Sequence, residues 1–426
     1  MAQWRNWSGS VASTPAEIAR PTDEAALSAL VKRAGKLRVT GAGHSFMPLC
    51  DTDGVLVSLA DMEGSIEVAP DRKTVLAPAG MSLRKLTPAL WEHGLSLPNQ
   101  GDVDPQALAG AIGTGTHGTG ESLGSLSTIA RSFRLVLADG SIVECSPSNQ
   151  PDLFEAQRLS LGLFGVASKI RIDVLPAYSL EERIERRPLA EVAERLDELA
   201  GATRHMEFFV FPYSDDVIFK TLHPTTEEAA FKEPPAYEDT IFQLACDLGS
   251  AAKFLIPALQ RFLTAASSST RRIGPAFRIF PSERNVRFEE MEYELPRAAG
   301  LAALREVMAW IRRKGAPVMF PFEFRLTAGD DIWMSPFNKG PGASISMHQY
   351  SRMAWRDLFK DAEAIFRSHG GRPHWAKRHT LTYGEVSELY PMADRYRAVR
   401  AQVDPQGKFL NPHLASLFGP EESARG

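Results

Sequence analysis

Two charged side chains stand two positions apart within residues 321–325, where Glu323 and Arg325 alternate with phenylalanines. On a β-strand such positions point to one face, so the carboxylate and the guanidinium would lie side by side. An acid and a guanidinium together can bind a polyol through charge-assisted hydrogen bonds and polarise a C–OH group as a hydride leaves. A purely structural ion pair would have the same spacing, so the pattern alone leaves both roles open.

Two glycine-rich stretches in the first third of the chain, residues 39–46 and 107–120, could bind a phosphate. Small residues let backbone N–H groups approach a phosphate closely. The first stretch is not a Rossmann fingerprint, because Phe46 occupies the position of the third glycine and Pro48 follows before a helix could begin. Each stretch also contains one histidine. Two such loops suit a large bent cofactor with a diphosphate.

Residues 372–379 place Lys377 between two histidines, His374 and His379. Standing alone, this lysine has a simple interpretation as a solvated side chain. The two histidines are five positions apart, which is poor spacing for one helical face, and no carboxylate or cysteine partner is evident in the sequence. We therefore expect no metal site.

The glycine-rich stretches resemble the flavin domain of the vanillyl-alcohol-oxidase family, through a G-x-G-H-S turn and a G-T-G-T-H-G-T-G loop. The resemblance implies bound FAD, which in the oxidases of that family is often bonded covalently to the histidine of the first loop. Here that histidine is His44. From the residues alone, His44 could equally cap a turn and His117 could be structural. The resemblance assigns these residues to cofactor binding: Thr40, Gly41, Ala42, Gly43, His44, Ser45, Phe46, Gly110, Gly113, Thr114, Thr116, His117, Gly118, Thr119, Val166 and Asn411.

Three motifs in the second half resemble the aldonolactone oxidase group, to which alditol oxidase is related. They are E-x-R followed by D-D-I and M-S-P in residues 323–336, H-W-x-K in 374–377, and D-P-x-G-x-F-x-N in 404–411. The resemblance implies that Glu323 and Arg325 line the substrate pocket and that Lys377 lies beside flavin and substrate. A cation there stabilises the reduced flavin. His348 is a candidate substrate contact, the alternative being a core histidine bonded to a backbone carbonyl.

Short strands with small helical insertions must position these side chains, which favours an α+β fold over a doubly wound sheet. The resemblance implies the two-domain vanillyl-alcohol-oxidase or PCMH type. We predict an FAD-binding domain at residues 1–175 and an α+β substrate (cap) domain at 176–426, whose part 372–420 returns to the flavin. Residues 241–267 have helical spacing that Pro257 interrupts, which predicts two helices. The region 225–285 does not resemble the family.

The composition of the chain argues against several classes of protein. The 426 residues are 44% hydrophobic and 23% charged, as in ordinary soluble globular proteins. The net charge is −4, from 48 basic and 52 acidic residues. The chain therefore lacks the excess of basic residues that is typical of nucleic-acid-binding proteins. Three cysteines are too few for a disulfide framework or a cysteine-built metal site. No run approaches eighteen apolar residues and no signal-peptide pattern is evident, so we expect a cytoplasmic enzyme without a membrane span.

The expected reaction is FAD-dependent oxidation of a sugar-derived primary or secondary alcohol, foremost an aldono-1,4-lactone of the L-gulono or D-arabinono type. A hydride would pass to flavin N5, and molecular oxygen would then be reduced to hydrogen peroxide. Alternatives are an alditol oxidase and an aldonolactone dehydrogenase with another electron acceptor. From other classes, a flavin-fold protein that binds a ligand without turnover and a Rossmann-type NAD enzyme stay open.

Overall fold

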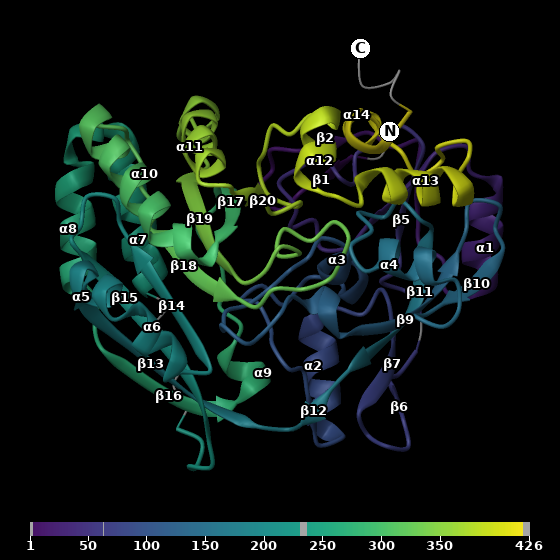
Figure 1. Cartoon of the computed structure of the whole chain (residues 1–426), viewed down its shortest axis with the longest axis horizontal. Helices are drawn as coiled ribbons and strands as arrows, with labels where there is room; N and C mark the ends of the chain where they lie inside the picture. The colour runs from purple at the N-terminus through teal and green to yellow at the C-terminus, as the bar shows by residue number, and fades with distance from the viewer. Residues whose placement is uncertain (1–2, 63, 231–236, 421–426) are drawn as a thin grey trace.

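The computed structural model describes residues 3–62, 64–230 and 237–420. Its two halves lie side by side: elements from the first part of the chain and from the C-terminus form one half, and one large sheet with its helices forms the other (Figure 1). Most neighbouring strands are antiparallel, and helices are inserted between them. The predicted α+β class is therefore confirmed.

The first half is built on two small sheets. A five-stranded antiparallel sheet has the order β10-β9-β11-β7-β6, and a three-stranded parallel sheet has the order β3-β5-β4. Strand β4 leads into the first glycine-rich stretch, and helix α3 lies within the second. The elements are β3 (Glu17–Ala19), α1 (Glu24–Arg33), β4 (Leu37–Thr40), β5 (Val55–Ser58), β6 (Glu67–Val68), β7 (Thr74–Pro78), α2 (Leu83–Glu92), α3 (Leu108–Gly113), β9 (Ala130–Val136), β10 (Ile142–Cys145), α4 (Pro151–Gln157) and β11 (Val166–Asp173).

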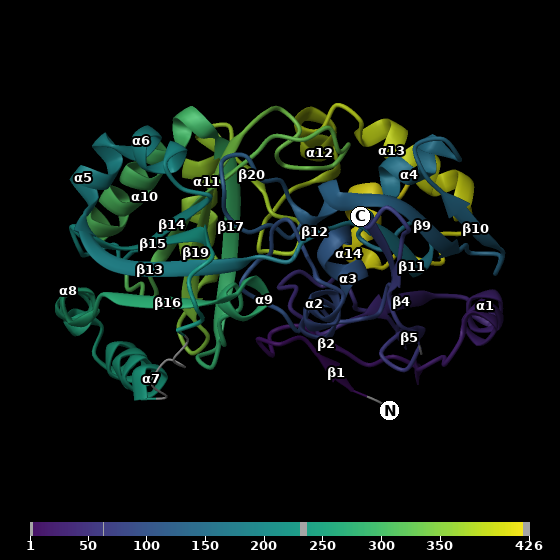
Figure 2. The same ribbon diagram turned by 90° about the horizontal axis from the view of Figure 1, so that it is seen from below.

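The second half is organised around one eight-stranded antiparallel sheet with the order β16-β13-β15-β14-β18-β19-β17-β20. Its strands are β13 (Ser179–Pro188), β14 (His205–Val210), β15 (Asp216–Thr225), β16 (Thr270–Pro275), β17 (Phe288–Pro296), β18 (Phe322–Thr327), β19 (Gly342–Tyr350) and β20 (Arg372–Pro373). Helices α5 (Leu189–Glu194), α6 (Leu196–Gly201), α10 (Gly300–Lys314) and α11 (Arg356–Ser368) lie on one face (Figures 1 and 2).

Apolar side chains of the sheet and the helices pack together on that helix-covered face. Phe208 and Phe324 stack there with ring centroids 4.7 Å apart, inside a core shared with α10 and α11. Because side chains alternate along a strand, the residues next to these phenylalanines in β14 and β18 point to the opposite face of the sheet, toward the first half of the molecule. Glu207, Glu323 and Arg325 are among them.

The C-terminal part of the chain returns to the first half. Helices α12 (Tyr383–Leu389), α13 (Ala393–Val403) and α14 (Pro412–Phe418) share its hydrophobic core. The ring of Tyr396 meets that of Phe164 edge-on at 4.7 Å, and the buried Arg38 guanidinium donates to the Phe409 carbonyl. The division at residues 175 and 176 stays a prediction.

The predicted helix pair exists, as α7 (Tyr237–Ala251) and α8 (Ile256–Ala266). Pro257 occupies the first turn of α8, where proline is tolerated, and does not interrupt a longer helix. Residues 231–236 of the unassigned region lie outside the described residues. Among the residues that the structure does describe, no helix combines the length and apolar character needed to cross a bilayer.

Candidate active site

The two glycine-rich stretches line one cavity of about 930 Å³, which is within the usual size range of cofactor sites. It is bounded by the end of β4, the turn that follows, helix α3 and the start of β11. Ten residues that the sequence assigned to cofactor binding line it: Thr40, Gly41, Ala42, Gly43, His44, Ser45, Gly110, Gly113, Thr114 and Val166.

The first loop suits a diphosphate. Within the described part of the chain, the backbone amides of residues 42–45 donate to no protein acceptor, as expected of a turn that holds an anion. Gly43 has a φ of 70°, a left-handed conformation that favours glycine. A Cβ built at Gly41 would lie 3.1 Å from that of Ala107, so the two loops approach too closely for a larger residue. These features fit FAD.

Six residues assigned to the cofactor lie outside this lining, and their role in binding stays a prediction: Phe46, Thr116, His117, Gly118, Thr119 and Asn411. Several make structural contacts. The Thr119 hydroxyl donates to the Met206 carbonyl, and Asn411 caps α14 and donates to the Pro48 carbonyl at 2.7 Å. The second loop also continues into the large sheet, where the Gly120 amide donates to the Leu326 carbonyl at 2.7 Å.

His44 lies against the indole of Trp7, with ring centroids 5.5 Å apart and planes 24° from parallel. Burial lowers the pKa of His44 to about 4, and the positive charge of Lys377 lowers it further in the same direction. The imidazole is therefore neutral near pH 7 and keeps one nitrogen lone pair available.

The H-W-x-K segment is bonded directly to the first glycine-rich turn. The Phe46 amide donates to the Ala376 carbonyl at 2.7 Å. The Lys377 ammonium lies 5.1 Å from the centre of the Phe46 ring and donates to Glu290 at 2.5 Å. Lys377 is thus neither remote from His44 nor a freely solvated side chain.

Glu323 and Arg325 lie on one face of β18, as their spacing predicts. The Arg325 Nε donates to Glu323 at 2.8 Å, and the guanidinium also lies 3.4 Å from Glu207 and 3.9 Å from Glu292. These carboxylates outweigh burial and raise the pKa of Arg325. A guanidinium among three acids keeps its charge and retains donors for a ligand.

The register of the sheet extends this charged face. Lys220 on β15, Glu207 on β14, Arg325 on β18, Ser344 on β19 and Glu294 on β17 occupy matching positions on successive strands. The Lys220 ammonium lies 2.8 Å from Glu207. Burial raises the pKa of Glu207 to about 7, against the opposing pull of Lys220. The two cations of this row, Lys220 and Arg325, therefore lie on either side of the Glu207 carboxyl group.

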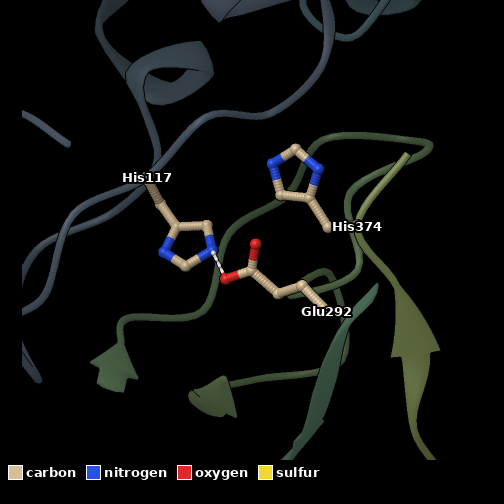
Figure 3. Close-up of side chains that lie close together, drawn as sticks. All are labelled: His117, Glu292 and His374. Atoms are coloured by element: carbon tan, nitrogen blue, oxygen red, sulfur yellow. Dashed lines mark ion pairs between the residues drawn. The ribbon is translucent and has the colours of Figure 1, made fainter. Parts of the chain in front are cut away.

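His117, Glu292 and His374 come together where the second glycine-rich loop meets β17 (Figure 3). The Nε2 of His117 is 3.3 Å from Glu292 and 3.2 Å from Glu294. Burial lowers the pKa of His117, but the two carboxylates outweigh it and raise the pKa to about 10. His117 is therefore a cation that joins the two halves.

No carboxylate partner of His374 is evident in the sequence, but Glu292 lies beside it in the structure, while His379 lies apart beside His413. The Nδ1 of His374 accepts from the Ala376 amide at 3.1 Å, so its Nε2 carries the proton in the neutral ring. The ligand atoms of His117, Glu292 and His374 lie within 4.8 Å of one another, and the expected absence of a metal stays a prediction.

The contacts of His348 on β19 agree in part with both predictions for this residue, a substrate contact and a core histidine. One ring nitrogen is 3.3 Å from the Pro321 carbonyl, as a core histidine would be, and the other is 3.4 Å from Glu290, the partner of Lys377. His348 is thereby one contact away from the lysine. Direct contact with substrate stays a prediction.

The acids that surround Glu323, Arg325 and Lys377 were not among the residues predicted from the sequence. Glu290, Glu292 and Glu294 alternate along β17 and are all buried, as is Glu207. Alternation of three glutamates within a strand pattern was the available signal, because it puts all three on one face. Glu207 and Lys220 carried no such signal, since their pairing depends on strand order.

Comparisons with known proteins agree with this geometry. A model of an FAD binding domain matches residues 15–146, and a model described as D-arabinono-1,4-lactone oxidase matches residues 170–417. L-gulono-1,4-lactone dehydrogenase of Mycobacterium tuberculosis is 38% identical over 98% of this chain and 99% of its own length. L-gulonolactone oxidase of Bos taurus is 30% identical, covering 98% of each chain.

Among solved structures, a solvent-stable cholesterol oxidase superposes with a TM-score of 0.82 over 97% of each chain at 17% identity, which shows the shared fold. The predicted two-domain flavoprotein fold is thus confirmed, with an FAD-binding domain and a substrate domain built on a large antiparallel sheet. From the match over more than half of its length, the chain belongs to the D-arabinono-1,4-lactone oxidase family of FAD-dependent oxidoreductases that act on CH–OH donors.

Proposed function

We propose that the protein is an FAD-dependent oxidase of an aldono-1,4-lactone of the L-gulono or D-arabinono type. One observation carries the proposal. The Phe46–Ala376 hydrogen bond holds Lys377 beside the end of the cavity at His44. The residues of the charged sheet face then continue from Lys377 through Glu290 to Glu292 and Arg325.

Bound FAD would supply the hydride acceptor. Arg325 and Glu323 offer a donor and an acceptor to vicinal hydroxyls, which would fix the carbon that reacts. Lys377 would place a positive charge beside the bound flavin, which gains negative charge when it accepts the hydride. Glu290 shares that ammonium and so holds it in position.

We further propose that His44 carries the covalent link to the flavin. Its neutral imidazole offers a nitrogen lone pair, and it lines the cavity that we assign to the cofactor. An acid-precipitated pellet should be yellow and fluorescent, and His44→Ala should leave a white pellet while still binding FAD. A white wild-type pellet would refute the link and leave the lactone chemistry standing.

Reduction of the bound flavin tests the substrate class. Under anaerobic conditions, L-gulono-1,4-lactone or D-arabinono-1,4-lactone should bleach the flavin faster than xylitol does. Faster bleaching by xylitol would favour an alditol oxidase, to which the charged face is also suited. No bleaching by any lactone or polyol would favour a binding protein.

The electron acceptor separates oxidase from dehydrogenase. The reduced enzyme mixed with air-saturated buffer should form peroxide in proportion to lactone consumed. Slow reoxidation by oxygen, with fast reoxidation by dichlorophenolindophenol, would instead show that the protein is a lactone dehydrogenase. That is the activity for which its mycobacterial relative is named.

A further inference from the structure

The charged side chains that would bind the lactone are largely closed off from solvent. The side chains of Glu323, Arg325 and Lys377 are 1, 12 and 20% exposed, respectively. None of the three lines the cavity of about 930 Å³ that we assign to the cofactor. A molecule of the size of a lactone therefore needs a covering segment to move before it can contact Glu323.

Residues 280–287, here called the strap, cross this charged face. They connect α9 (Ala276–Ile279), which follows the edge strand β16, to β17 near the other edge of the sheet. Helix α9 lies where the two halves meet (Figure 2). The ring of Phe280 meets that of His205 edge-on at 5.0 Å, and His205 lies on the same side of β14 as Glu207. The strap therefore runs over the charged face of the sheet and not over the helix-covered one.

An ion pair fastens the strap to the first half of the molecule. Arg284 donates to the Asp102 carboxylate at 2.8 Å, and the Ser282 amide donates to the Asp102 carbonyl at 3.1 Å. A carboxylate oxygen of Asp102 also lies within 4.8 Å of those of Glu207 and Glu323. The fastening point is thus directly beside the carboxylate that we propose for lactone binding.

The pair is ionic at neutral pH and can separate. Burial would raise the pKa of Asp102, but three nearby cations, Lys220, Arg284 and Arg325, outweigh it and lower the pKa. The Arg284 side chain is 32% exposed, and an ion pair that water can reach is weak and is screened by salt. If Arg284 withdraws, Lys220 and Arg325 still balance Asp102, so no buried charge is left unpaired.

The strap is anchored at both ends and exposed in the middle. Phe280 and Val286 are buried in two separate apolar clusters. Between them, Ser282 and Asn285 are exposed, and a bond from Asn285 to Asp239 on α7 is exposed as well. These described residues form no helix or strand, so no ladder of backbone hydrogen bonds resists their movement. The middle of the strap can therefore lift while its two ends stay in place.

We propose that the strap is a gate over the charged face, that the Asp102–Arg284 pair is its latch, and that a lactone contacts Glu323 and Arg325 only when the latch is open. The inference rests on the proposed function, because it takes these two residues as the lactone site. If the latched form excludes the lactone, the apparent dissociation constant is the intrinsic one divided by the open fraction. Loss of the latch should then tighten lactone binding, whereas loss of a residue that contacts the lactone weakens it.

Stopped-flow reduction of the flavin in the holoenzyme, over a range of concentrations of the preferred lactone, tests the gate. Arg284→Gln should lower the half-saturating lactone concentration about fivefold or more and leave the limiting rate unchanged. Arg284→Lys keeps the ion pair and should behave like the wild type. Arg195→Gln is the matched control, since it removes an exposed ion pair with Glu198 on the helix-covered side of the sheet.

Salt should act on the wild type as the substitution does. The lactone is uncharged, so its own contacts respond little to ionic strength. Raising sodium chloride from about 0.05 M to about 0.5 M should lower the half-saturating concentration in the wild type but not in Arg284→Gln. Equal salt dependence in both proteins would contradict the latch.

Hydrogen exchange gives a readout that uses no lactone. Peptides that cover the strap, including the Ser282 amide, should exchange about 10-fold faster in Arg284→Gln than in the wild type, with peptides of β17 unchanged. Unchanged exchange of the strap, or an unchanged or raised half-saturating concentration in Arg284→Gln, would overturn the gate. If no lactone reduces the wild-type flavin, the proposed function fails, while the exchange rates still decide whether Arg284 latches the strap.

Discussion

The cavity loops of the first half and the charged face of the large sheet present polar groups of different kinds. Around the first glycine-rich turn, the polar groups that we propose for ligand binding are backbone amides and one neutral imidazole. On the sheet and in the loop that follows β20, they are full charges: Arg325 and Glu323 on β18, and Lys377 in the loop. An amide row can hold a diphosphate without burying a cation, whereas a polyol with several equivalent hydroxyls needs directional charged partners.

The difference also predicts how each region responds to substitution. A buried charge is stable only with its partner, so removal of one charge leaves another uncompensated. A loop of small residues instead depends on its backbone conformation, so a substitution there destabilises the loop through backbone strain. Substitutions on the sheet should therefore affect chemistry or pH dependence strongly, and substitutions in the loop should affect cofactor retention more moderately.

The largest effect is expected for Lys377→Met. The variant should keep its flavin, but reduction by the preferred lactone should slow about 10³-fold, or about 4 kcal/mol, because the growing negative charge loses its cation. Stopped-flow absorbance of the flavin measures this rate. Lys36→Met is the control, since that exposed lysine pairs with Asp53 at the surface. Unchanged reduction in Lys377→Met would remove this lysine from the chemistry.

His117→Gln tests the ion pair that joins the two regions. The pKa of His117 is raised from an ordinary 6.5 to about 10, so its stabilisation is complete below pH 6.5 and is lost as the pH rises through 10. Between these values, the wild type should lose on the order of 3 kcal/mol of unfolding free energy relative to the variant. Urea unfolding across this range measures the difference, with His369→Gln, beside the exposed Glu306, as control. A difference independent of pH would mean that His117 is neutral.

Glu323→Gln should reduce the rate of flavin reduction about 10²-fold, or about 2.7 kcal/mol, without loss of flavin. The amide keeps the shape and can still accept from Arg325, but it no longer balances the guanidinium. Glu185→Gln is a matched control, because Glu185 pairs with Arg187 at the same spacing on β13 but away from this face. If both variants retain full activity, the Glu323–Arg325 pair is scaffold.

The two regions also differ in how far the sequence predicts them. The loop residues are contiguous, and the need for small residues and left-handed glycine is local, so ten predicted positions do line one cavity. The same-face placement of Glu323 and Arg325 follows from strand period alone. What brings Glu207, Lys220 and Glu292 to them is the order of strands in an eight-stranded sheet, which no local pattern specifies.

Position in the fold, rather than residue type, also decides the role of the histidines. His117 is a buried cation because two glutamates from β17 face it, and His374 is neutral although it lies in the same cluster. Both sit in motifs that are recognisable in the sequence, but neither motif contains the glutamates. The protonation states therefore required the structure.

Gly43→Ala should give the smallest effect and tests the loop side of the contrast. With a φ of 70°, alanine at this position is strained by about 1–2 kcal/mol, and its Cβ would also lie 3.1 Å from the Trp4 ring. The turn must shift, which displaces the amide row of residues 42–45, so flavin content and melting temperature should both fall while the rate per bound flavin is kept. Gly35→Ala, where a Cβ meets nothing within 4 Å, should change neither. Normal flavin content in Gly43→Ala would show that side chains, and not this backbone turn, hold the cofactor, and the contrast between the two regions would fail.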